Sequence, residues 1–345
     1  AQIYPLVKSN TGWKTGIEDS KNILNNSSTT LTGTSIGYNF SESRNTKDVN
    51  CLAVEKFYDP ACVWTGYESS LQPYKVIGYT TKSIWTYINS EVVTQYSGSG
   101  NVVTTKNYSY NDYGLLSSES LTSSDGIVVE TKTKYPSDIN TGAYLSMKNL
   151  NMLNYPIEVV GLKNSNVTGS SLTTYKSNGT GYVPDKVYKL EFVAPFSGSS
   201  FTYFNGSTKD SRYSSTAEIS YDVYNTTNGN LRQTTTRDGI TTAYLWDSSG
   251  NYPMAEVKGA TYSLISAQDG KTCSYSSNTL WTDLNTLAPN AMINTYGYYP
   301  LIGLKYATNP KGTITYYDYD TFGRLRLVRN ADYHLVNRYK YNYKQ

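Results

Sequence analysis

A short phrase recurs in the sequence: an aromatic residue, a spacer, a second aromatic residue followed by Asp or Asn, two variable positions and a glycine. Three copies keep this spacing: Tyr108-Ser-Tyr110-Asn111-Asp-Tyr-Gly114, Tyr244-Leu-Trp246-Asp247-Ser-Ser-Gly250 and Tyr317-Asp-Tyr319-Asp320-Thr-Phe-Gly323. A recurring phrase is typical of repeat architectures, in which each unit packs against its neighbours. The phrase therefore points to a structural repeat rather than to an active site.

Each copy has the pattern of a strand that runs into a turn. Aromatic residues two positions apart point to the same face of a strand. The Asp or Asn side chain can accept hydrogen bonds from backbone N–H groups, and glycine supplies the positive φ that closes the turn. We therefore expect positive φ at Gly250 and Gly323, and backbone hydrogen bonds to Asp247 and Asp320 within their own turns.

A second signal precedes the phrase. Gly126, Gly239 and Gly312 are each followed by alternating residues, and Gly239 and Gly312 both stand eight residues before the Asp of a phrase. Alternation with period two is typical of half-buried strands, and Asp-Gly between such runs favours a hairpin. The sequence therefore predicts an all-β chain of serial antiparallel hairpins. One aromatic and β-branched strand face is expected from these residues: Ile240, Thr242, Tyr244 and Trp246.

The phrase, together with Gly-Arg-Leu at 323–325 and Gly-Asn-Leu at 229–231, resembles the YD repeat of Rhs-type and teneurin-like proteins. The stretches 242–256 and 287–304 resemble more specifically the C-terminal part of the large secreted YD-repeat proteins of Bacteroidetes. The resemblance runs from about residue 80 to the end of the sequence. It implies an extended or spiralling YD-repeat β-sheet, which in the family sometimes closes into a shell around a toxin domain.

The spacing of the phrases divides the chain into four segments. Residues 1–75 lack the phrase and are expected to form a divergent segment or a cap over the first sheet edge. Residues 76–258 are predicted to form YD-repeat β-sheet, 259–294 a short helical insertion, and 295–345 the C-terminal YD-repeat hairpins.

Two stretches of the insertion space their apolar residues at intervals of three and four, which predicts two short helices over 260–267 and 278–287. Asn278 or Thr279 is the expected N-cap of the second helix, and Pro289 stops it. The apolar face of the second helix is expected from these residues: Leu280, Trp281, Leu284 and Leu287.

The charge balance disfavours a nucleic-acid partner. The sequence has 30 Lys and Arg against 27 Asp and Glu, a net charge of +3. A nucleic-acid-binding protein usually shows a basic excess or stripe, and the nearest candidate, the alternating arginines between 324 and 329, is typical of a solvated strand face.

The sequence contains no apolar run long enough to span a membrane. Loops rich in Ser, Thr, Asn and Gly are typical of extracellular β-proteins, so we expect an extracellular or cell-surface location.

The cysteine pattern permits one disulfide. Cys51 and Cys62 flank Asp59-Pro60, a plausible loop, so a bond between them is a hypothesis for an exported protein. Cys273 is then left over, which counts against a full disulfide framework.

The sequence offers little for catalysis. Its single histidine, His334, lies between two strand-like stretches, and no Gly-x-Ser-x-Gly motif or closely spaced set of zinc ligands occurs. We expect no enzyme activity, no cofactor and no metal. Most acidic residues fall in expected turn positions, which explains them without chemistry: Asp112, Asp125, Asp222, Asp238, Asp247 and Asp320.

The chain has 36 tyrosines against 7 phenylalanines, a composition suited to a half-buried sheet. The favoured hypothesis is a non-catalytic, exported YD-repeat scaffold that acts in protein interaction or encapsulation. Its partners would be other protein segments or chains, such as a cargo or a secretion partner. The alternative is a carbohydrate-binding surface protein that stacks glycans on exposed tyrosines. A glycan site needs a cluster of exposed aromatic residues, whereas a scaffold buries most of them.

Overall fold

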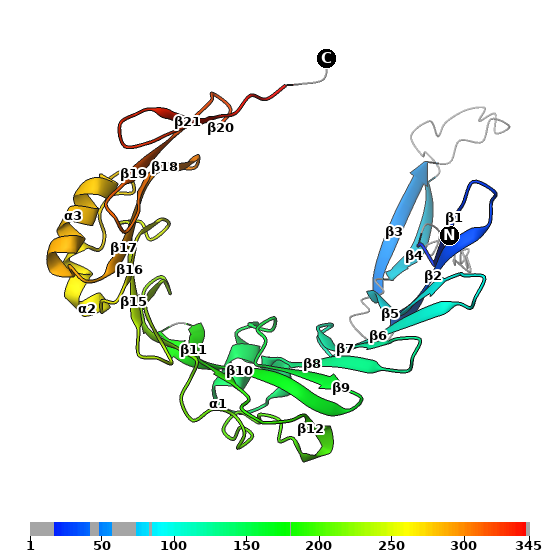
Figure 1. Ribbon diagram of the computed structural model, residues 1–345. Helices are drawn as coiled ribbons and strands as arrows, with labels where there is room; N and C mark the ends of the chain where they lie inside the picture. The colour runs from blue at the N-terminus through cyan, green and yellow to red at the C-terminus, as the bar shows by residue number, and fades with distance from the viewer. Residues whose placement is uncertain (1–16, 42–47, 57–73, 83–84, 180, 343–345) are drawn as a thin grey trace, which may run out of the picture. The chain divides into compact units, whose positions relative to one another are not determined.

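The computed structural model describes residues 17–41, 48–56, 74–82, 85–179 and 181–342 (Figure 1). Antiparallel strands dominate these residues, and the helices among them are few and short. The prediction of an all-β chain of serial antiparallel hairpins is therefore confirmed. The chain divides into two compact units, residues 1–131 with 163–165 and residues 132–162 with 166–345. The four predicted segments remain predictions.

In the first unit the strands pair in the order β1, β2, β5, β6, β7, each antiparallel to the next. Two further strands, β3 and β4, form a separate two-stranded ribbon. Most of the described residues between 17 and 56 therefore lie in strands β1, β2 and β3. Strand β2 pairs with β5 over ten positions. The bounds are β1 Ser20–Leu24, β2 Thr30–Ser41, β3 Asp48–Lys56, β4 Tyr74–Lys82, β5 Trp85–Gln95, β6 Val102–Tyr110 and β7 Leu116–Thr122; β8 spans Val128–Lys134.

The second unit begins with long hairpin strands around a first apolar core. Its early elements are η2 Pro136–Asp138, α1 Gly142–Asn149, β9 Glu158–Lys163, β10 Asn166–Asn178, β11 Gly181–Lys189, β12 Phe196–Ser197 and η3 Gly198–Ser200. Helix α1 places Tyr144 and Met147 against Ile157, Val160 and Leu172 of the sheet. These aliphatic side chains alternate along β9 and β10 with partly exposed ones, which is the period-two pattern of a half-buried strand.

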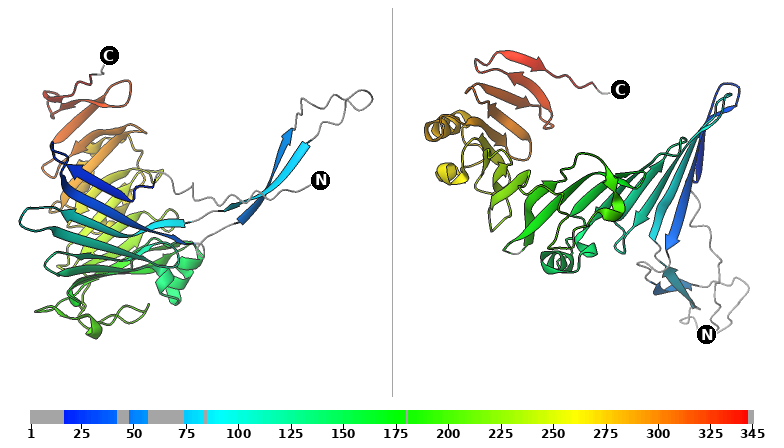
Figure 2. Two further views of the ribbon diagram at one scale, coloured as in Figure 1. Left: turned by 90° about the vertical axis from the view of Figure 1, so that its right-hand side faces the viewer. Right: turned by 60° about the horizontal axis from the view of Figure 1, so that its bottom comes forward.

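The rest of the second unit is a run of antiparallel strands from β13 to β21, each paired with the next. Helices α2 and α3 lie on one side of strands β15 to β17 (Figures 1 and 2). The strand bounds are β13 Ile219–Tyr224, β14 Leu231–Thr236, β15 Thr241–Trp246, β16 Pro253–Lys258, β17 Met292–Tyr299, β18 Gly303–Thr308, β19 Ile314–Tyr319, β20 Leu325–Arg329 and β21 Leu335–Arg338. The helix bounds are α2 Tyr262–Ile265, η4 Ser266–Gln268 and α3 Ser277–Leu287.

The buried face of β15 lies opposite the predicted aromatic and β-branched face. Ala243 and Leu245 are fully buried under the helices, while Tyr244 and Trp246 are only half-buried. Small and aliphatic side chains let Leu280 and Leu284 of α3 approach the sheet closely. Tyrosine and tryptophan tolerate the wetter face, because each has a polar group that finds a partner there.

The second helix begins earlier than predicted. Its N-cap is Ser276, whose hydroxyl accepts a hydrogen bond from the N–H of Thr279 at 3.3 Å, so the expected N-caps Asn278 and Thr279 lie inside the helix. Ser277 is fully buried and shares a hydrogen bond of 2.9 Å with the hydroxyl of Thr308. This tertiary contact is made by the first residue of the helix, Ser277, which lies one residue before the predicted range 278–287.

Candidate functional site

The predicted phrases end in closely related turns. In the first, the N–H of Gly114 donates to the carbonyl of Asn111 at 3.0 Å, and Asn111 Oδ1 accepts from the N–H groups of Tyr113 and Leu115 at 3.0 and 3.1 Å. Asp320 repeats this arrangement, accepting from the N–H groups of Phe322 and Arg324 at 2.9 and 3.0 Å. The side-chain oxygen thus satisfies two backbone donors that the strand ladder leaves unpaired.

Asp247 organises a version that is one residue longer. Its Oδ1 accepts from the N–H groups of Asn251 and Tyr252 at 2.8 and 3.0 Å, and its Oδ2 accepts from the hydroxyl of Ser249 at 2.6 Å. Burial by itself would raise the pKa of Asp247, but these hydrogen bonds outweigh it and hold the pKa below its ordinary value. The ionised form of this carboxylate is therefore favoured, and both of its oxygens accept hydrogen bonds from within its own turn.

The glycines close these turns from the left-handed region. Gly114, Gly250 and Gly323 have φ of 78°, 74° and 73°. An L-residue with a Cβ is disfavoured at such angles, so glycine is the residue that closes the turn without strain. The hydrogen bonds and dihedral angles explain the Asp, Asn and Gly of each phrase by backbone geometry alone.

Other copies of this turn lie outside the repeated phrase, and of these the sequence marked only the one closed by Gly312. Asn25, Asn309 and Asn330 each accept from the N–H groups two and four residues ahead, at 2.9 to 3.1 Å. The aromatic pair that identified the phrase does not precede them. In two copies the closing glycine is also replaced, by Ser28 and Tyr333 at φ of 62° and 60°. For Asn25 and Asn330 the usable signal was the Asn alone, which is common in any loop.

Two of the turns that end the phrases and the turns that precede the alternating runs share the same backbone hydrogen bonds. Two different side-chain arrangements supply the acceptor for their remaining N–H groups. Where the first residue is Ser123 or Thr236, its hydroxyl donates to the Asp two positions on, Asp125 or Asp238. That Asp then accepts from the same N–H group that Asn or Asp would reach directly, at 3.2 Å for Ile127. Backbone closure is unchanged throughout. Seven turns among the described residues share it, starting at Asn25, Asn111, Ser123, Thr236, Asn309, Asp320 and Asn330.

This equivalence predicts a rescue. Asp238→Ala is expected to lower the melting temperature modestly, because the N–H of Ile240 and the hydroxyl of Thr236 each lose an acceptor. Adding Thr236→Asn to that variant should restore most of the loss, since Asn at the first position reaches the same backbone donors. Thermal unfolding of the single and double variants measures this. A double variant less stable than Asp238→Ala would show that the two side-chain arrangements are not interchangeable.

One acidic residue does not have the expected turn role. Asp222 lies within β13, where its Oδ2 accepts from the hydroxyl of Thr235 at 2.5 Å and from the side-chain amide of Gln233 at 3.2 Å. Both partners lie on the neighbouring strand β14. The prediction of a turn position for Asp222 is therefore wrong. The turn that follows is held by Asn225, which accepts from the N–H of Thr227 at 2.8 Å.

The second unit also buries a polar cluster that the sequence did not indicate. Glu158 is fully buried on β9 and accepts from the N–H of Phe204 at 3.0 Å and from the hydroxyl of Tyr213 at 2.9 Å. The Tyr213 hydroxyl also lies 2.5 Å from that of Ser170. Burial raises the pKa of Glu158 despite these two hydrogen bonds. Both donors come from the irregular segment between η3 and β13, so the carboxylate ties that segment to the core.

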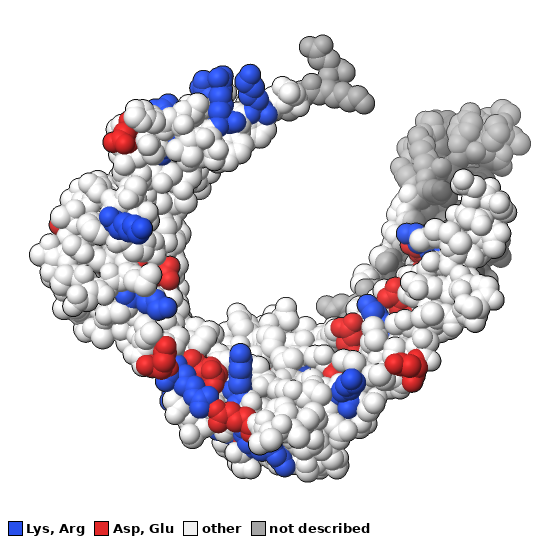
Figure 3. All heavy atoms as spheres, in the orientation of Figure 1, with Lys and Arg blue, Asp and Glu red and all other residues white. Residues whose placement is uncertain are grey.

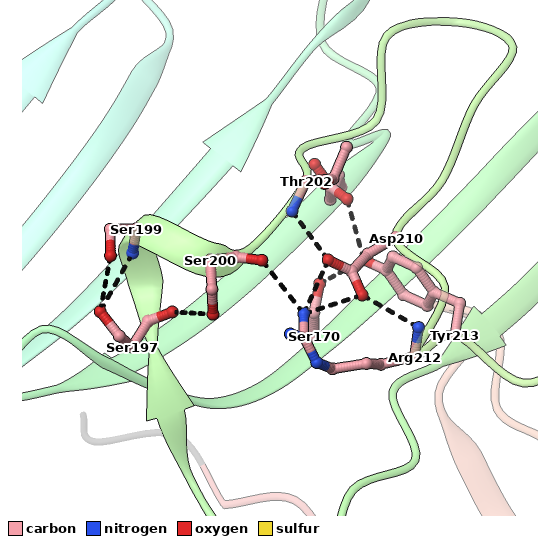
Figure 4. Close-up of polar contacts among 9 residues, drawn as sticks. Ser170, Ser197, Ser199, Ser200, Thr202, Asp210, Arg212 and Tyr213 are labelled. Atoms are coloured by element: carbon pink, nitrogen blue, oxygen red, sulfur yellow. Dashed lines mark hydrogen bonds and ion pairs between the residues drawn. The ribbon is translucent and has the colours of Figure 1, made fainter.

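A second carboxylate folds the same segment on itself, as Figure 4 shows. Asp210 accepts from the N–H of Thr202 at 2.8 Å and from the N–H of Arg212 at 2.9 Å, and it pairs with the Arg212 guanidinium at 3.0 Å. Burial opposes ionisation of Asp210, but these donors hold its pKa below the ordinary value. Glu158 and Asp210 are thus both committed to internal donors, which suits a structural role better than acid–base chemistry.

A groove of about 450 Å³ opens over the C-terminal strands of the second unit. Its principal side chains come from β17 to β20 and from the turn that follows: Tyr299, Lys305, Tyr316, Asp318, Arg329 and Tyr333. Tyr316 and Tyr333 stack with their ring centroids 4.5 Å apart. A side-chain hydrogen bond with Tyr333, together with burial, raises the pKa of Tyr316 to about 12. Apart from this group, most tyrosines among the described residues are half-buried.

Tyr333 is a backbone outlier in this groove. It occupies the closing position of the turn that starts at Asn330, at φ 60°, where five of the seven turns have glycine. The left-handed conformation costs an L-residue about 1–2 kcal/mol, and stacking of two aromatic rings returns about 0.5–1.5 kcal/mol. The cost of the positive φ and the gain from stacking are of similar size. Stability therefore gives no reason for a tyrosine rather than a glycine at this position.

The arginines near the C-terminus are largely paired. Arg324 donates to Asp320 at 2.8 Å and Arg329 lies 3.0 Å from Asp318. Arg326 is exposed. On the face drawn in Figure 3, basic side chains gather over β20 and β21, whereas acidic and basic side chains are interspersed over the earlier strands of the second unit.

The remaining expectations concern disulfides, metals and membranes. Cys62 lies outside the described residues, so the bond with Cys51 stays a prediction. Within the described ranges no three His, Cys, Asp or Glu side chains gather as a metal site would require. No helix in the described part of the chain is long and apolar enough to cross a membrane. The N–H of His334 donates to Asn330 at 2.9 Å, so this residue belongs to a turn.

Comparisons with known proteins give limited information. No protein-family model and no curated protein matches the sequence. Three solved structures align with 87% of this chain: crystal structures of TcdB2-TccC3 without the hypervariable C-terminal region, of TcdB2-TccC3-TEV and of TcdB2-TccC3. Their identities are 7, 8 and 7%, and their TM-scores are 0.48, 0.46 and 0.46. The aligned part spans only 15 to 16% of those chains. TM-scores below 0.5 do not establish a shared fold.

Proposed function

We propose that this chain is a non-catalytic YD-repeat scaffold, exported to the cell surface or beyond, that acts in protein interaction or encapsulation. One observation carries the proposal: the acidic and amide side chains of the repeated phrases are occupied by backbone donors of their own turns. Asn111, Asp247 and Asp320 each accept at least two such hydrogen bonds. Groups engaged in this way hold a repeat together and are not available to a substrate.

The buried carboxylates support the same function. Glu158 has a raised pKa, which is a feature of many catalytic acids. Yet it is fully enclosed, and each of its oxygens accepts a hydrogen bond, from Phe204 or from Tyr213, so no substrate atom can approach it. A structural network perturbs pKa values just as an active site does, and the internal donors of Glu158 support a structural role.

The experiment is co-expression of the chain with the products of neighbouring genes and with any further segments that its own gene encodes. A scaffold is expected to form a stoichiometric complex in which a partner segment becomes resistant to protease. The matched control is the chain with Asp247→Asn, Asp320→Asn and Glu158→Gln, which should keep the complex because each substitute retains an acceptor oxygen. A chain that binds none of these segments, or a hydrolytic activity that this triple variant loses, would overturn the proposal.

A further inference from the structure

Two of the seven turns lack the closing glycine, and of these only the turn from Asn330 lines the groove. Gly114, Gly126, Gly239, Gly312 and Gly323 close their turns at positive φ, whereas the turn from Asn330 is closed by Tyr333 at φ 60°. Strained backbone at a side chain that lines a cavity is a common mark of a functional position. The ring of Tyr333 is 61% exposed and lies along the groove.

The second observation is the chemistry of the groove. Asp318 Oδ2 is buried and lies 3.0 Å from Arg329 Nη2, an ion pair, while the Asp318 side chain as a whole is 37% exposed. An ionised carboxylate can accept about four hydrogen bonds, so Asp318 retains acceptor capacity. Lys305 Nζ lies over the rings of Tyr299 and Tyr306, 5.3 and 5.4 Å from their centroids. Aromatic faces therefore alternate with charged donors and acceptors along one surface.

We propose that this groove binds a short oligosaccharide. A pyranose ring has an apolar C–H face and a rim of hydroxyl groups, which the exposed face of Tyr333 and the Asp318–Arg329 pair complement. The volume of about 450 Å³ lies within the range of small-ligand sites. The proposal goes beyond the scaffold function, does not depend on it, and gives the carbohydrate alternative a specific site.

Other ligand classes fit less well. Binding of a phosphate-rich ligand requires a cluster of cations, and here Asp318 neutralises Arg329 and leaves Lys305 as the single surplus cation of the lining. A purely apolar ligand would leave Lys305, Asp318 and Arg329 without their water, which costs more than the tyrosine faces return. A neutral or weakly charged polyhydroxyl ligand satisfies both parts of the lining.

The test begins with the chain on a printed glycan array of microbial, plant and animal oligosaccharides, followed by calorimetric titration with the best binder. Wild type is expected to bind, and Tyr333→Gly is expected to weaken binding at least about tenfold. The same variant should keep a melting temperature close to that of wild type, because the lost stacking on Tyr316 is offset by relief of the positive φ. Loss of binding without loss of stability is a result that a merely structural tyrosine would not produce.

Two further variants keep the outcome decisive. Asp318→Asn removes charge but little volume and should also weaken binding about tenfold. Tyr155→Ala removes a tyrosine that is 40% exposed in the same unit but outside the groove, and should leave binding unchanged. An array without any bound glycan for the folded chain would overturn the proposal. So would equal binding by wild type and Asp318→Asn, or by wild type and a folded Tyr333→Gly.

Discussion

Replacing Glu158 by Ala is expected to destabilise the protein by about 3 kcal/mol. The substitution removes the only side-chain acceptor shown for the buried N–H of Phe204 and one acceptor for the hydroxyl of Tyr213, and it leaves a cavity in the first core. Denaturant unfolding followed by circular dichroism measures the loss. The segment between η3 and β13 should also become sensitive to protease, because Glu158 is its tether to β9.

Glu158→Gln is the matched control and should cost much less. Its amide keeps the shape and one acceptor oxygen, and the Tyr213 hydroxyl can donate to Ser170 instead. If Glu158→Ala were as stable as wild type, the buried cluster would not hold the segment in place.

The same pair of variants gives a pH dependence whose sign follows from the raised pKa of Glu158. A carboxyl group with a higher pKa in the folded state binds its proton more tightly there than in the unfolded chain. Its stabilising contribution is therefore present below the ordinary Glu pKa of about 4.3 and is lost as the pH rises through the raised value. Relative to Glu158→Gln, wild type should lose stability as the pH rises above about 4.3. Lys134 and Asp210 also act on this carboxyl group, with opposite signs.

Asp247→Ala is expected to cost about 2 kcal/mol, the larger effect among the repeat turns. Asp247 is only 6% exposed, so the N–H groups of Asn251 and Tyr252 would lose their acceptor where water has little access. Asp320→Ala should cost less, because the N–H groups of its turn can reach solvent. Thermal unfolding of both variants, with Asp247→Asn as the control that retains Oδ1, measures the difference. Equal stability of Asp247→Ala and Asp247→Asn would contradict the turn role.

Sequence patterning identified the strands and turns because both depend on local geometry. Gly250 and Gly323 are recognisable since few other residues adopt positive φ cheaply, and the Asp three positions earlier reaches its own backbone without any distant partner. The turn at Asn330 escaped notice for the same reason: with Tyr333 in place of glycine, nothing in the local sequence marks it.

Features that depend on tertiary packing were beyond the reach of the sequence. The buried face of β15 is decided by α2 and α3, which follow it in the chain, so alternation alone could not tell Leu245 from Trp246. Glu158 had no recognisable pattern, because its donors lie 46 and 55 residues away. The groove brings together residues from four strands, one turn and the start of α3, and no spacing in the sequence indicates it.

The central claim is that the acidic residues of the repeated phrases belong to the backbone turns and not to a reaction. The most direct measurement is a carbon-13 NMR titration of the Asp247 carboxyl group in the intact chain. Hydrogen bonds from its own turn hold the pKa of Asp247 below the ordinary Asp value of about 3.9, so the signal should stay in its ionised position until the pH falls beneath that value. A pKa above about 3.9 would contradict the account, because it would place the carboxylate in an environment that favours its protonated, proton-donating form.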